Sequence, residues 1–133
     1  MIPPRPSYST RQAWSPPAVL LEAAGEEDDG LIVSLIDAFS TDTDARIEQM
    51  RKALAASDFP SIRAEAHTVK GGARQMGADA VDEACQELEI ACDLQEASLI
   101  AARLNRVQEL FADVRGAMAA YSNSRRMESS VTP

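Results

Sequence analysis

The feature that most constrains this chain is an apolar residue at every third or fourth position through one long segment, residues 28–56. These residues are Ile32, Leu35, Ile36, Phe39, Ile47, Met50 and Leu54, with Thr43 in phase between them. This spacing places the side chains on one face of an α-helix, whereas a strand would need alternation. A helix of this length must bury its apolar face against other elements. The segment therefore predicts a mainly helical fold.

Other segments show the same spacing or clear boundary signals. A short helix is predicted over about residues 18–24 and ends at Gly25. Asp58 followed by Pro60 marks the start of a helix that runs to about residue 75. Further helices are predicted at about 78–93 and 96–121. Because aromatic residues make up only 5% of the chain, a sheet is disfavoured. We expect an all-α fold, an antiparallel up-down four-helix bundle with a short extra N-terminal helix.

The two ends of the chain lack this periodicity. Residues 1–17 are rich in proline and predict a flexible arm, in which Trp14 is expected to dock on the core. Residues 122–133 predict a flexible tail, so the folded domain is expected over residues 18–121. The initial Met1 and the single predicted domain favour a free-standing protein, although a part of a larger protein stays possible.

Composition excludes several classes of function. The chain has 13 Lys and Arg against 21 Asp and Glu, a formal net charge of −8, and no basic stripe that would favour nucleic acid. No apolar run approaches the roughly 20 residues that span a bilayer. The N-terminal residues lack the apolar stretch of a secretory signal. We therefore expect a cytoplasmic protein that binds neither nucleic acid nor membranes.

Metal and disulfide chemistry are also disfavoured. One histidine and two cysteines are too few for the usual structural zinc site. Cys85 and Cys92 lie seven residues apart in a predicted helix, about 10 Å along its axis, which is beyond the reach of a disulfide. Both are expected to be small core residues.

The single histidine lies on the polar side of the predicted helix 58–75. The apolar stripe of that helix is Ile62, Ala66, Val69, Ala73 and Met76. The opposite side carries Arg63, His67, Lys70, Gly71 and Arg74. A glycine inside a helix costs about 1 kcal/mol relative to alanine, so Gly71 and Gly72 favour a need for open surface beside the imidazole. An ordinary surface histidine, with glycines that pack against another helix, would give the same pattern.

The string AHTVKGGARQMGA, residues 66–78, resembles the histidine-containing phosphotransfer (HPt) domain of bacterial two-component phosphorelays. The family's hallmark is His-x-x-Lys-Gly after an alanine, followed by small residues and Gly-Ala. The similarity extends to LIDAFSTDTDARIEQMRKALAASD before the string and CQELEIAC after it, and covers roughly residues 19–120. Gly72 and the bulkier Arg74-Gln75-Met76 depart from the usual small residues, which bears on partner preference.

The resemblance implies that His67 is a phosphoacceptor through its Nε2 atom. Lys70 would lie beside the phosphoryl group, Glu89 would hydrogen-bond Nδ1, and Gln86 would assist. A carboxylate that accepts the Nδ1 proton fixes the tautomer and leaves the Nε2 lone pair free to attack. An ordinary solvated Glu89 is the alternative.

The resemblance also implies the partners. A receiver domain of a hybrid sensor histidine kinase would supply the phosphoryl group from its aspartate, and a response regulator would take it. Receivers are expected to dock over the histidine helix and its neighbour. The candidate partner-binding residues are Arg63, Ala64, Gly71, Arg74, Gln75 and Asp82.

The sequence has no nucleotide-binding glycine-rich loop, no second histidine to act as a base and no carboxylate trio suited to Mg²⁺. We therefore expect a phosphoryl carrier without a cofactor and not an enzyme, with the Mg²⁺ held by the receiver, and we expect a monomer. A helical adaptor that docks a kinase or receiver without carrying phosphate is the first alternative. A metal-dependent hydrolase or a dimerising kinase core is the second, disfavoured by the lone histidine and the missing ATP site. The sequence does not identify the cognate kinase, the regulator or the output pathway.

Overall fold

A computed structural model describes residues 14–25 and 29–131, with the side chains of 14–25 and 30–125. The described residues form helices and no strand, so the expected all-α class is confirmed. The helices are α1 (Ala18–Ala24), α2 (Asp29–Ala55), α3 (Phe59–Gln75), α4 (Asp79–Leu94) and α5 (Ala97–Val131).

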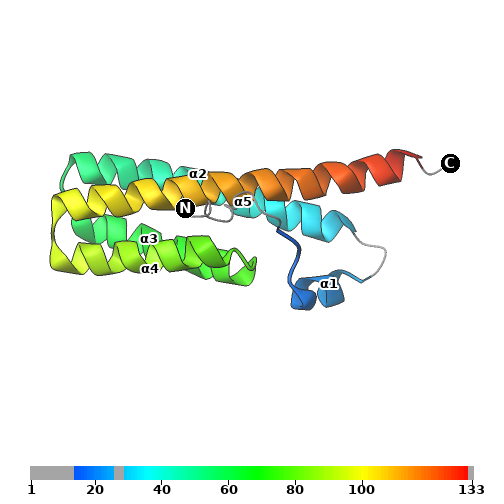
Figure 1. Ribbon diagram of the computed structural model, residues 1–133, viewed down its shortest axis with the longest axis horizontal. Helices are drawn as coiled ribbons and strands as arrows, with labels where there is room; N and C mark the ends of the chain where they lie inside the picture. Colours follow the sequence, from blue (N-terminus) through cyan, green and yellow to red (C-terminus); the bar gives the residue numbers. More distant parts are fainter. Residues whose placement is uncertain (1–13, 26–28, 132–133) are drawn as a thin grey trace, which may run out of the picture.

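The four long helices close an up-down bundle. α2 packs on α3, α3 on α4, α4 on α5 and α5 on α2. The α3–α4 pair covers one end of the longer α2–α5 pair, and α1 lies beside the other end of α2 (Figure 1). Short turns join successive long helices from α2 onward, so neighbours in sequence run antiparallel.

The apolar stripes that the sequence predicts meet in one core. Every α2 position of the stripe is buried except Leu35 and Leu54, which are partly buried. Thr43 is 1% exposed, so it belongs to the core as its phase predicts. Phe39 of α2 meets Phe111 of α5 edge to face, with ring centroids 6.0 Å apart. Such a pair adds about 0.5–1.5 kcal/mol to the burial of the two rings.

Local signals in the sequence set the bounds of α3. The side chain of Asp58 accepts a hydrogen bond from the backbone N–H of Ser61 at 3.2 Å, and Pro60 lies in the first turn. A cap of this kind stabilises a helix by about 1 kcal/mol. Beyond the other end, Gly77 has φ +70°, a conformation that glycine adopts readily, and the chain turns there into α4.

The predicted end of the last helix at Tyr121 is wrong. α5 continues to Val131, through the first ten residues of the expected tail. Neither glycine nor proline occurs between Gly116 and Pro133 to stop it. Tyr121 and the buried Ser122 also pack on the fold, which stabilises this turn of the helix.

The segment before α1 is attached to the bundle. The indole N–H of Trp14 donates a hydrogen bond to the Met76 carbonyl at 2.8 Å. Its ring stands edge-on to Tyr121, with centroids 5.7 Å apart. The expected docking of Trp14 is therefore confirmed, while residues 1–13 of the predicted arm lie outside the described residues. Within the described ranges, no helix combines the length and apolar character that a membrane crossing needs.

Cys85 and Cys92 are both buried and unpaired, as the sequence predicts. Burial, with smaller contributions from Glu89 and Asp82, raises the pKa of Cys85 to about 12. Burial also raises the pKa of Cys92, and Asp93 adds to this effect. The thiolate is the reactive form of cysteine, so neither side chain is suited to redox chemistry.

We therefore predict that both thiols of the folded protein react with Ellman's reagent far more slowly at pH 8 than the same thiols in guanidinium chloride. The free energy of unfolding should fall as pH rises from about 9 towards 12, because the unfolded thiols ionise while the buried Cys85 keeps its proton. Chemical denaturation across this pH range measures the effect. Cys85→Ala should reduce the slope; a native thiol that reacts at the denatured rate would contradict the prediction.

Candidate functional site

The exposed seam between α3 and α4 carries a regular series of polar pairs, which we call the α3/α4 ladder. The tight turn at Gly77 makes the two helices antiparallel, so each step forward on α3 is matched by an equal step back on α4. The steps are four, three and four residues, which keeps the pairs on one face of each helix. The rungs are Arg63–Asp93, His67–Glu89, Lys70–Gln86 and Arg74–Asp82.

His67 is one of the accessible members of this ladder. Its side chain is 67% exposed, and its Nδ1 lies 3.3 Å from Oε1 of Glu89. An ionised carboxylate can only accept a hydrogen bond, so Nδ1 is the donor, and in the neutral ring of this tautomer Nε2 carries the free lone pair. The geometry therefore places at an exposed surface an imidazole whose Nδ1 is engaged by Glu89.

Glu89 is buried, which excludes the alternative of a solvated surface glutamate. Its side chain is 5% exposed and is neutralised by cations from α3. The ammonium of Lys70 lies 2.7 Å from Oε2, and Nη1 of Arg63 lies 3.4 Å from Oε1. A buried carboxylate is tolerated only when it is paired in this way.

Lys70 is held by two groups of α4. Its ammonium donates a hydrogen bond to Oε1 of Gln86 at 2.8 Å and also reaches Glu89, and the side chain is 14% exposed. The described site thus brings together His67, Lys70, Glu89 and Gln86. Here the ammonium neutralises the carboxylate that contacts His67, and its role towards a phosphoryl group stays a prediction.

The two adjacent glycines of α3 have different surroundings. A Cβ at Gly71 would meet nothing within 4 Å, so this position leaves open surface one helical turn from His67. A Cβ at Gly72 would lie 3.5 Å from the Phe39 ring, which makes Gly72 a packing position against α2. Ala64 and Gln75 are exposed on the same helix. The packing interpretation thus holds for Gly72, and the need for open surface at Gly71 stays a prediction.

The charges of the ladder balance. Arg63, Lys70 and Arg74 face Asp93, Glu89 and Asp82, three cations against three anions, in a chain of net charge −8. Each cation is within 3.3 Å of an acid on α4. The basic residues therefore do cluster around His67, but as paired groups and not as a free positive patch.

Two exposed apolar residues of α4 were not predicted from the sequence. Ile90 and Leu94 are 50% and 59% exposed and lie one turn apart on α4, each next in sequence to an acid of the ladder. Their spacing of four residues, outside the buried stripe of α4, was a signal that could have identified them.

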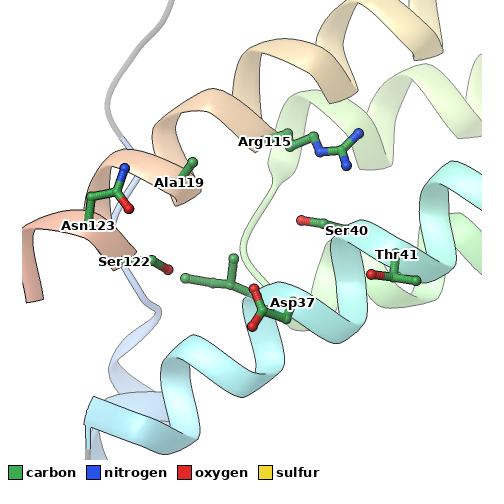
Figure 2. Close-up of a pocket in the computed structure, with 8 residues that line it drawn as sticks. Asp37, Ser40, Thr41, Arg115, Ala119, Ser122 and Asn123 are labelled. Carbon is green, nitrogen blue, oxygen red and sulfur yellow. The ribbon is translucent and has the colours of Figure 1, made fainter. Parts of the chain in front are cut away.

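A surface pocket elsewhere in the bundle lacks the residues of the ladder. A pocket of about 240 Å³ lies between α2 and α5. Figure 2 shows Asp37, Ser40 and Thr41 of α2 on one side of it and Arg115, Ser122 and Asn123 of α5 on the other. No ladder residue lines it. Among the described residues, no group of three or more His, Cys, Asp and Glu is placed to hold a metal ion.

Comparison with known proteins identifies the family. The sequence model of the Hpt domain family matches residues 34–117 of this chain, which include the whole ladder. This chain belongs to the Hpt family. The resemblance carried by residues 66–78 is thereby confirmed, and the family assigns this Hpt domain a phosphotransfer role in two-component signalling.

Solved structures support the assignment. Histidine-containing phosphotransfer protein B (HptB) from Pseudomonas aeruginosa PAO1 is 31% identical, with a TM-score of 0.72 over 80% of this chain and 90% of that protein. The phosphotransfer protein ZmHP2 from maize shares the fold at 22% identity, with a TM-score of 0.72 over 86% and 80% of the two chains. No curated protein matches significantly. In this Hpt domain His67 is the single histidine of the sequence.

Proposed function

We propose that this Hpt domain is a phosphorelay intermediate in which His67 accepts a phosphoryl group from the receiver of a hybrid sensor kinase and passes it to a response regulator. One observation carries the proposal. The only histidine of an Hpt-family chain is 67% exposed and has its Nδ1 at 3.3 Å from a buried, ionically paired glutamate. This is the arrangement that an exposed Nε2 nucleophile needs.

The transfer begins with attack of the Nε2 lone pair on the phosphorus of an aspartyl phosphate. The N–P bond forms while the P–O bond to the aspartate breaks, and the electron pair of that bond returns to the carboxylate. The ring becomes positively charged because it keeps its proton on Nδ1. The carboxylate of Glu89 stabilises that charge through the contact it already makes. Transfer to a response regulator runs through the same steps in reverse.

Lys70 contributes a second electrostatic effect. Its ammonium lies one helical turn from His67, and a phosphoryl group on Nε2 would compete with Glu89 and Gln86 for it. At about 4 Å and partial exposure such an interaction is worth on the order of 1–4 kcal/mol before solvent competition. We expect Lys70 to stabilise the phosphorylated form by turning part of its charge from Glu89 to the phosphoryl oxygens.

The receiver would dock over the ladder. Gly71 leaves room beside the imidazole, and Ala64 and Gln75 are exposed on the same helix. Ile90 and Leu94 offer apolar contact area on the α4 side. Arg63, Arg74 and Asp82 would form the polar rim. The receiver would supply the aspartate and the Mg²⁺, so the Hpt domain acts as a carrier and a substrate of its partners.

An adaptor that docks a receiver without carrying phosphate is the remaining alternative. It would use the same exposed surface, but it would have no need for an imidazole whose Nδ1 is held by a buried carboxylate. Phosphoryl transfer to His67 therefore separates the two functions.

We predict that the wild-type chain accepts label from a radiolabelled, phosphorylated receiver domain and that His67→Gln accepts none. The substitution removes the nucleophilic nitrogen at a side chain that is 67% exposed, so the helical circular dichroism should stay unchanged. Labelling of the variant at the wild-type level, or no labelling of the wild type by any of a panel of receivers, would contradict the phosphorelay function.

We predict that Gly71→Gln slows phosphoryl transfer by at least about tenfold, because a long side chain would enter the open surface beside His67. Gly116→Gln is the matched control. An added Cβ there also meets nothing within 4 Å, but the position is on α5, outside the ladder. Both variants should stabilise the helix by up to about 1 kcal/mol. Equal transfer rates for the two variants in single-turnover assays would remove Gly71 from the docking surface.

A further inference from the structure

Arg63 contacts two acidic residues of α4: its ladder partner Asp93 and the buried carboxylate of Glu89. Its Nε lies 2.8 Å from Oδ1 of Asp93, and its Nη2 donates to Oδ2 at 3.4 Å. The third nitrogen, Nη1, lies 3.4 Å from Oε1 of Glu89. One guanidinium therefore lies between two carboxylates that are one turn apart on α4.

Oε1 of Glu89 is the oxygen that contacts His67. Nδ1 of His67 lies 3.3 Å from this oxygen and Nη1 of Arg63 lies 3.4 Å from it, so both groups interact with the same carboxylate oxygen. Oε2 is occupied by Lys70 at 2.7 Å. Glu89 is only 5% exposed, so its own end of both contacts is shielded from water, while Arg63 and His67 stay in partial contact with solvent.

We propose that Arg63 is a positioning residue that weakens the hold of Glu89 on the Nδ1 proton of His67, and that Asp93 limits this effect because it offsets part of the charge of the same guanidinium. A guanidinium on Oε1 lowers the negative potential at the imidazole, which disfavours the doubly protonated ring. The guanidinium therefore opposes the attraction of Glu89 for a second proton on the ring. The consequence for phosphoryl transfer rests on the proposed function, whereas the effect of Arg63 on the protonation of the His67 ring does not.

The other charged and titratable groups near His67 are few, and each has an identified partner or charge state. α3 contributes Arg63 and Lys70, and α4 contributes Glu89 and Asp93. The thiols of Cys85 and Cys92 are neutral at pH 7 because burial raises the pKa of both. On the α2 side, Arg46 pairs with Glu65 at 2.7 Å, and Glu65 is two residues from His67 and so does not share its face.

The test is an NMR titration of the unphosphorylated full chain. His67 is the only histidine, so the imidazole signals need no assignment. Relative to wild type, Arg63→Gln should raise the measured pKa of His67 by at least about half a unit, and Asp93→Asn should lower it. Arg74→Gln is the matched control, since Arg74 pairs with Asp82 at 3.2 Å but makes no contact with Glu89. Its shift should be less than half that of Arg63→Gln.

The double variant separates positioning from a simple change of charge. If Asp93 acts through Arg63, then Asp93→Asn should lose most of its effect in the Arg63→Gln background. Strict additivity of the two shifts would overturn the proposal, as would equal shifts for Arg63→Gln and Arg74→Gln. Circular dichroism of each variant verifies the fold; Arg63 and Asp93 are about half exposed, so substitution leaves the core intact.

The outcome for phosphoryl transfer is read separately. Arg63→Gln should shift the pH midpoint of phosphoryl acceptance upward with the titration of the ring. If His67 accepts no label at any pH, the proposed function fails, while the titration of the unphosphorylated protein still decides the role of Arg63.

Discussion

Glu89 is a carboxylate with 5% of its side chain exposed, and its charged partners come from α3. Removing such a group from water costs several kcal/mol unless cations and hydrogen-bond donors replace the solvent. Lys70, Arg63 and His67 supply them across the α3–α4 seam. Satisfying this one carboxylate requires a single register of α3 against α4, and that register aligns the other rungs of the ladder.

The remainder of the bundle gives the seam a rigid base. Ile62, Val69 and Leu88 are almost fully buried beneath it, and Phe39 contacts the helix at Gly72. Close packing of this kind fixes α3 against α4, so His67 and Glu89 face each other across the seam. In the phosphoryl carrier proposed above, neither partner would then have to order the histidine.

Most of the fold could be predicted from local patterns, because apolar spacing and caps are properties of short segments. The bounds of α3 followed from Asp58, Pro60 and Gly77 in this way. The end of α5 did not, since it depends on the absence of a stop signal and on a contact between Tyr121 and the distant Trp14. The roles of His67 and Glu89 were proposed from resemblance; the burial of Glu89 and its contact with Arg63 depend on helix packing, which no single segment encodes.

The central claim is that Glu89 occupies Nδ1 and leaves Nε2 of His67 as the nucleophile. The most direct test phosphorylates the ¹⁵N-labelled protein with phosphoramidate and records the long-range ¹H–¹⁵N spectrum of the imidazole. The account predicts phosphorus on Nε2 with the proton retained on Nδ1. Phosphorus on Nδ1, or an imidazole that stays unmodified, would contradict it.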